Sequence, residues 1–271
     1  MNYIFNPQRF WFLLRKTIFE RRLQIGGIFI LSILGAFLMY YSQVFTDNGR
    51  IHTDFQDWLG AQTDSFGISF ILGSIALSGL LFNYFSETEK GYSYLTLPAS
   101  YFEKWLCGVF IMLSFVLYSL LVFRAMDTAF VSYYRSAIVS LVSDVDTFTK
   151  SAVVLPFNIE NLRLPYFFTM ALTSVVVVGS LYFNKLALIK SVFIGVGVFI
   201  ALQFLNGTIA GALFDEEVST TFFFSRVYLI KSDVSVHLPP MLMSFFNNLY
   251  TFIIPVALWF IALIRLREKE F

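Results

Sequence analysis

Six stretches of the chain are long and apolar enough to cross a membrane as helices. Each is close to the ~20 residues that a helix needs to cross ~30 Å of hydrocarbon. None has an Asp, Glu, Lys, Arg or His in its interior, and such side chains inside a membrane are typical of ion and proton pathways. Their absence from the sequence argues against an ion-driven pump. The stretches cover residues 25–45, 66–85, 105–123, 165–183, 191–213 and 246–264.

The segment before the first stretch has the pattern of an amphipathic helix. Between Pro7 and Arg22, one side of the helix is apolar and the other carries charges such as Arg9 and Lys16. A basic helix of this kind lies in the membrane interface, so we expect residues 1–24 to form an interfacial helix. Its apolar side is made of Phe10, Leu13, Leu14, Thr17 and Ile18.

The connection between the second and third stretches contains more structural signals than a simple loop needs. Ser86 and Glu89 have the spacing of a capping box at a helix N-terminus, and so do Ser100 and Glu103. Pro98 falls between the two pairs and is expected to end the first element. The pattern therefore predicts a short helix, a turn and the start of a second helix. This connection is either a solvated loop or a docking surface for a cytoplasmic partner.

Two longer segments, residues 124–164 and 214–245, separate stretches on the opposite side. In the first, apolar residues recur at i, i+3, i+4 and i+7 from Phe130 to Phe148, which predicts an amphipathic helix too polar to cross the membrane. The second has a mixed pattern, and its aromatic run at residues 222–224 is consistent with partial insertion into the membrane.

Composition and charge agree with a membrane protein and set its orientation. Hydrophobic residues make up 57% of the chain and charged residues 14%, whereas soluble domains have ~25% charged residues. Twelve of the 19 Lys and Arg residues lie before the first stretch, in the second and fourth connections, or in the C-terminal tail. Because cytoplasmic segments are enriched in Lys and Arg, we expect both termini in the cytoplasm. A net charge of +1 argues against nucleic-acid binding.

The sequence lacks the motifs of catalysis and of nucleotide binding. It has no Gly-x-x-x-x-Gly-Lys-Ser/Thr loop for phosphate, no Gly-x-Ser-x-Gly and no His-Glu-x-x-His. Cys107 is the only cysteine, and the two histidines lie outside the six stretches. We therefore predict no catalytic, cofactor-binding or metal site, and no enzyme activity in this chain. Active movement of a substrate would need energy from another subunit.

These features resemble the permease subunits of bacterial ABC-2-type transporters. The likeness covers the six spans with cytoplasmic termini, the basic helix before them, and the Leu-Pro-Ala-Ser-x-x-Glu-Lys segment at residues 97–104. It implies an all-α integral membrane protein of the bacterial inner membrane, with one transmembrane domain over residues 1–271. It also implies a homo- or heterodimer of permease subunits, served by cytoplasmic ATP-binding subunits that bind ATP and Mg²⁺. The residues that it assigns to coupling with those subunits are Glu87, Glu89, Lys90, Tyr92, Tyr94 and Leu97.

The resemblance also places spans one, two and five near the subunit interface and the substrate pathway. Five polar residues of spans two and five would then line the pathway; the alternative is that they bond to neighbouring helices. They are Ser74, Ser78, Asn83, Gln203 and Asn206.

Two functions from different classes remain open at this point. The first is the permease of an ATP-driven exporter of a lipid, peptide, glycan or drug-like molecule. The second is a non-transporting scaffold in which ATP hydrolysis drives mechanical signalling to an extracytoplasmic partner. An intramembrane enzyme is disfavoured, because no acid–base pair is found in the spans.

Overall fold

The computed structural model divides into two compact units. The first comprises Met1–Leu80 and Pro98–Thr169, and the second Leu81–Leu97 and Met170–Phe271. The residues that the structure describes are 5–44, 55–82, 84, 97–139, 154–157, 159–183, 185–214, 218–220, 226–231, 234–237 and 239–268.

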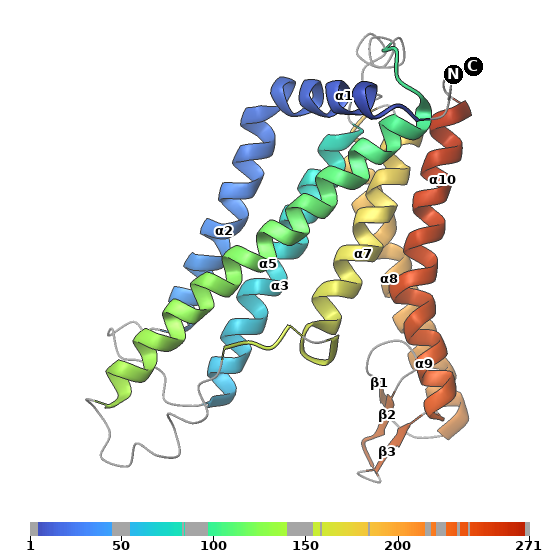
Figure 1. Cartoon of the computed structure of the whole chain (residues 1–271). Helices are drawn as coiled ribbons and strands as arrows, with labels where there is room; N and C mark the ends of the chain where they lie inside the picture. The colour runs from blue at the N-terminus through green and yellow to red at the C-terminus, as the bar shows by residue number, and fades with distance from the viewer. Residues whose placement is uncertain are drawn as a thin grey trace. The chain divides into compact units, whose positions relative to one another are not determined.

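The first unit is built from long helices, and one short helix lies across their ends (Figure 1). Helix α1 stops at Arg21, whose φ of −116° and ψ of 21° break the helical geometry before α2 begins. The Arg21 guanidinium donates to the carbonyl oxygen of Leu80 near the end of α3, where a cation is favoured by the helix dipole. The elements are α1 (Pro7–Glu20), α2 (Arg22–Val44), α3 (Phe55–Leu81), α5 (Tyr101–Val139) and the first part of α7 (Ile159–Tyr182).

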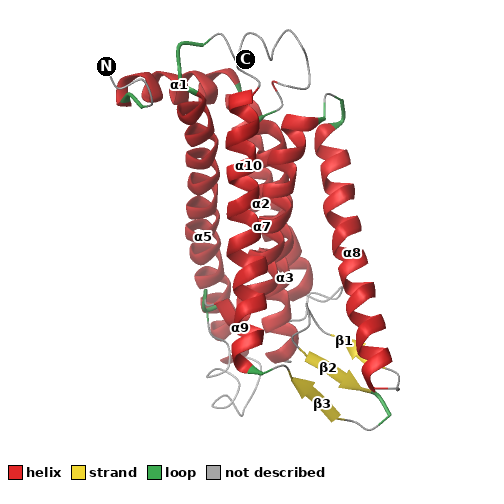
Figure 2. Cartoon of the chain, turned by 90° about the vertical axis from the view of Figure 1, so that its right-hand side faces the viewer, coloured by secondary structure: helices red, strands yellow, loops and turns green. Residues whose placement is uncertain are grey.

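The second unit combines helices with a small sheet (Figure 2). The sheet has the order β1-β2-β3, and both pairs are antiparallel, with Val218 opposite Leu229 and Arg226 opposite His237. The elements are the rest of α7, α8 (Ala187–Phe214), β1 (Val218–Thr220), β2 (Arg226–Leu229), β3 (Val234–His237), α9 (Pro240–Asn248), the π-helical turn η2 (Leu249–Ile253) and α10 (Ile254–Glu268).

Six helical segments in the described ranges are long and apolar enough to span a membrane, as the sequence predicts. The chain is therefore a multi-pass helical membrane protein. The helical content agrees with the predicted all-α class, and the segment after α8, for which the sequence predicts no element, adds a small sheet. That segment is rich in β-branched residues, which favour strands. The six segments are Arg22–Gln43, Gly60–Leu81, Tyr101–Tyr133, Pro165–Tyr182, Ala187–Phe214 and Pro240–Glu268.

The third span is much longer than predicted. Helix α5 has 39 residues and continues from the predicted end at residue 123 to Val139, which corresponds to about 58 Å. No Gly or Pro interrupts the sequence there, so nothing ends the helix. The first part of the predicted separate outer helix, from Phe130 to Val139, is thus the end of α5. The remainder of that prediction, residues 140–148, lies outside the described residues.

Aromatic rings fill the contacts among α2, α3 and α5. The ring of Phe115 is buried, and its centroid lies 5.1 Å from that of Phe29 in α2. Phe66 of α3 is also buried and lies 4.9 Å from Phe123 of α5. Gly73 allows this packing, because a Cβ there would lie 2.6 Å from Cζ of Phe115. Part of the high Phe content therefore serves helix packing.

A buried carboxylate in the second half of α5 binds neighbouring elements. Asp127 is 1% exposed, and its Oδ1 accepts hydrogen bonds from Tyr40 Oη at 2.7 Å and Gln62 Nε2 at 2.8 Å. Its Oδ2 accepts from the backbone N–H of Leu155 at 2.7 Å. Arg124 donates to the carbonyl oxygen of Leu155 at 2.7 Å. We call these five residues the Asp127 cluster; it fastens the segment 154–157 to α2, α3 and α5.

Substitution of Asp127 by Asn should destabilise the protein with little change in volume. The new amide group would present an N–H donor where the carboxylate accepts one, so at least one buried donor would lose its acceptor. An unsatisfied buried donor costs roughly 1–3 kcal/mol, and each kcal/mol lowers the Tm by about 2–4 °C in a protein of this size. Thermal unfolding of the detergent-purified variant measures this loss.

The matched control is Asp64→Asn, because Asp64 is an exposed carboxylate of α3 in the same unit. Exposed substitutions change stability by only about 0.5 kcal/mol. Equal Tm values for the two variants would show that the Asp127 cluster contributes no more than the surface does.

Candidate functional site

The best-defined polar site lies where the connection between spans two and three enters α5. Ser100 precedes the helix, and its Oγ accepts a hydrogen bond from the N–H of Glu103 at 3.2 Å. Glu103 Oε2 in turn accepts from the N–H of Ser100 at 2.9 Å. This reciprocal pair is a capping box, which confirms the predicted start of the helix. The Ser and Glu of the Leu-Pro-Ala-Ser-x-x-Glu-Lys segment therefore have a local structural role.

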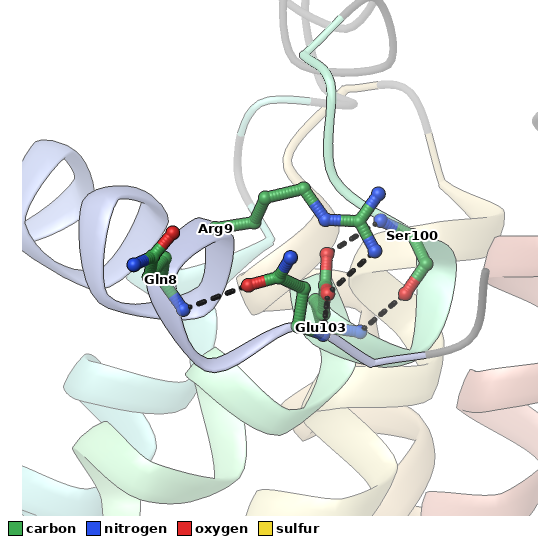
Figure 3. A network of polar contacts seen from close by, with 5 residues as sticks. Gln8, Arg9, Ser100 and Glu103 are labelled. Carbon is green, nitrogen blue, oxygen red and sulfur yellow. Dashed lines mark hydrogen bonds and ion pairs between the residues drawn. The ribbon is translucent and has the colours of Figure 1, made fainter. Parts of the chain in front are cut away.

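The same carboxylate binds the start of α1, which the sequence pattern does not predict. Glu103 Oε1 accepts from the N–H of Asn6 at 2.6 Å and pairs with Nη2 of Arg9 at 3.1 Å (Figure 3). Asn6 is itself the N-cap of α1, since its Oδ1 accepts from the N–H of Gln8 at 2.9 Å. We call Asn6, Arg9, Ser100 and Glu103 the Glu103 joint.

The charges of the Glu103 joint are balanced. The side chain of Glu103 is 0% exposed, and an isolated buried carboxylate would cost several kcal/mol. Here it faces the N-terminal ends of two helices, each equivalent to about half a positive charge, and the guanidinium of Arg9, which is 37% exposed. One buried group thus links α1 to α5 and is fully supplied with donors.

The contact between α1 and α5 continues along one face of α1. Leu13, Leu14 and Thr17 are buried, and the Thr17 hydroxyl lies 3.9 Å from Sγ of Cys107. The ring of Phe10 lies 6.2 Å from that of Phe110. Most of the predicted apolar side of α1 therefore packs against α5. The location of α1 at the membrane interface remains a prediction.

The structure describes one of the residues predicted to couple to an ATP-binding subunit. Leu97 lies half-buried in a bend that leads to Ser100. The others lie outside the described residues; they are Glu87, Glu89, Lys90, Tyr92 and Tyr94. The capping box predicted at Ser86 also lies there, so the helix predicted for this connection stays a prediction.

The predicted pathway residues divide between the two units. In the first, Ser74 and Ser78 are buried one turn apart on α3, and the Ser78 hydroxyl donates to the carbonyl oxygen of Ile75 at 2.9 Å. In the second, Asn206 is buried on α8 and Gln203 is half-buried. Asn83 lies outside the described residues. The Ser78 bond lies within α3 itself, so the pathway role of these residues and the alternative of bonds to neighbouring helices both stay predictions.

Sequence reasoning predicted the capping role of Glu103, but neither its burial nor the buried carboxylate of Asp127. The six predicted spans contain no charged residues. Helix α5, however, extends past both ends of the predicted third span and carries Glu103 and Asp127. The two residues are 24 positions apart, which corresponds to about 36 Å along the helix, slightly more than the ~30 Å of hydrocarbon. An available signal was the uninterrupted helical pattern across residue 123. It would have placed Asp127 on the span helix.

No group of three or more His, Cys, Asp and Glu residues that could hold a metal ion occurs among the described residues. Neither a known protein family, nor a curated protein, nor a solved structure matches the chain. The functional argument therefore rests on the residues and contacts themselves.

Replacement of Glu103 by Gln should loosen α1 from α5. The carboxylate accepts hydrogen bonds from three N–H donors. The NH₂ group of the new amide would face at least one of them, and that donor would lose its acceptor. A lost buried hydrogen bond of this kind costs roughly 1–3 kcal/mol, which corresponds to roughly 5- to 140-fold faster local opening. Hydrogen–deuterium exchange of residues 7–20 measures the change, and the middle of α2 should exchange as before.

A control for this substitution is Glu268→Gln, because Glu268 pairs with Arg265 at 2.7 Å but is 54% exposed. It should leave exchange in α1 unchanged. Unaltered exchange of α1 in the Glu103 variant would mean that the Glu103 joint does not hold the helix.

Proposed function

We propose that the chain is the permease subunit of an ATP-driven ABC-2-type transporter in the bacterial inner membrane. In this proposal it exports a lipid, peptide, glycan or drug-like molecule. It forms the pathway as a homo- or heterodimer, and separate cytoplasmic subunits bind ATP and Mg²⁺. The observation that carries the proposal is the Glu103 joint, which lies directly after the segment that would contact those subunits.

The Glu103 joint supplies what mechanical coupling needs. A docking segment can transmit force only if its next element is stiff and firmly held. Residues 86–97 are followed within three residues by Ser100, which caps the 39-residue helix α5. The same joint holds α1 through Asn6 and Arg9. A displacement of the segment would therefore move α1 and α5 as a rigid body, the usual form of a domain-level switch.

The alternative function, a mechanotransmitting scaffold, is favoured by the Asp127 cluster. Asp127 is on the same helix as Glu103 and binds Leu155, which belongs to the long segment between spans three and four. Motion of α5 would thus reach that segment without any substrate pathway. Both functions use the same coupling element. Stimulation of ATP hydrolysis by a transported substrate would distinguish them, because only the exporter predicts it.

Removal of the two acidic residues predicted to dock should uncouple the complex. A docked charge is partly desolvated, and loss of one partner of such a pair costs ~2–5 kcal/mol. We therefore expect Glu87→Ala with Glu89→Ala to weaken assembly with the ATP-binding subunit or to separate ATP hydrolysis from transport. Pull-down and ATPase assays measure these effects, and the six-span fold should remain intact.

The matched control is Asp144→Ala with Asp146→Ala, a change of equal charge in the predicted outer segment. Ordinary surface changes cost only about 0.5 kcal/mol, so this pair should leave assembly unchanged. If the two double variants behave alike, the connection between spans two and three is a solvated loop and the coupling assignment is wrong.

A further inference from the structure

The face of α1 that points away from α5 carries large exposed aromatic side chains. Phe12 is 66% exposed and Phe19 is 59% exposed. They lie seven residues apart, two turns along one side of the helix, and Arg15 lies between them at i+3 from Phe12. Leu13 and Leu14, by contrast, are buried. Grouped exposed apolar side chains mark a surface that contacts a membrane or a partner.

Two cations complete this surface. The guanidinium of Arg15 lies 5.6 Å from the ring centroid of Phe19, and Nζ of Lys16 lies 3.6 Å from a carboxylate oxygen of Glu20. Lys16 and Glu20 are both nearly half-exposed, so water screens their attraction. Together Phe12, Arg15, Lys16 and Phe19 line a shallow, open depression on one face of α1, which we call the α1 groove.

Chain connectivity limits how far the end of α1 lies from the start of the first candidate span. Only Arg21 separates α1 from α2, and the first candidate span begins at Arg22. One residue spans at most ~3.8 Å. The end of α1 therefore lies within a few ångströms of the level where a membrane-crossing helix leaves the hydrocarbon. At that level the nearest anions are lipid headgroups and the nearest apolar groups are acyl chains.

We propose that the α1 groove binds the phosphate headgroup of an anionic phospholipid. Arg15 and Lys16 contact the headgroup, since guanidinium and ammonium groups donate several hydrogen bonds to phosphate. Phe12 and Phe19 contact the upper part of the acyl chains, as aromatic side chains do at membrane interfaces. A soluble acidic peptide could pair with Arg15 and Lys16. It would not account for the exposed rings of Phe12 and Phe19 beside them. The site does not depend on the proposed transport function, because it uses only α1 and the lipid next to α2.

Quenching of Trp11 by brominated lipids tests the proposal on the full chain. Trp11 is on α1 and 61% exposed, and replacement of Trp58, Trp105 and Trp259 by Phe makes it the single tryptophan. The protein is placed in phosphatidylcholine nanodiscs in which a rising fraction of the lipid is dibromo-phosphatidylglycerol, or dibromo-phosphatidylcholine in the reference series. Enrichment at the α1 groove gives half-maximal quenching at a lower fraction of phosphatidylglycerol than of brominated phosphatidylcholine.

The Arg15→Gln, Lys16→Gln double variant removes the cations and keeps the aromatic rings. Each cation near an anionic surface contributes roughly a fivefold gain in binding, so we expect a shift of about 30-fold or less toward the reference series. Lys185→Gln with Lys190→Gln is the control; both lysines are exposed, and Lys190 also lies 5.7 Å from an aromatic ring centroid. It should leave Trp11 quenching unchanged.

Two results would overturn the lipid site. One is equal quenching by the two brominated lipids in the parent protein. The other is a double variant that keeps the preference for phosphatidylglycerol. Unchanged quenching of the double variant by brominated phosphatidylcholine shows that α1 keeps its position, so a lost preference reports the cations alone.

Discussion

A carboxylate without water must be surrounded by donors, and this requirement organises one end of the first unit. Glu103 is fully buried and can be satisfied only if the N-termini of α1 and α5 meet at its two oxygens. That condition sets the position of α1 across the ends of the long helices. It also brings α1 against α5, where Thr17 is buried next to Cys107. Without the Glu103 carboxylate, α1 would lose its ion pair with α5.

Helix α5 connects this constraint with a second one. About 36 Å further along the helix, Asp127 requires donors from α2, α3 and the segment 154–157. A long helix held at its start and again at Asp127 by buried hydrogen-bonded carboxylates resists bending and sliding between these two points. Both proposed functions, export and mechanical signalling, use that property. They differ only in whether the motion opens a pathway for a substrate or reaches an outer partner.

The sequence predicts those parts of the structure that depend on residues close together in the chain. The six spans follow from runs of apolar residues, and the start of α5 follows from the three-residue spacing of Ser100 and Glu103. The contact of Glu103 with Asn6 could not be predicted, because the two residues are 97 apart and no periodicity links them. The partners of Asp127 are likewise 87, 65 and 28 residues away. The sheet was missed because strands of three and four residues are too short to show an alternating pattern.

Purification of the tagged chain from its native membranes in mild detergent tests the central claim most directly. The account holds that the chain is one part of an ATP-driven complex, with its coupling segment anchored at the Glu103 joint. It predicts an ATP-binding subunit in an amount equal to the chain, and ATP hydrolysis by the purified complex. A chain that is folded, with helical circular dichroism, yet carries no nucleotide-binding protein and no ATPase activity would contradict the account.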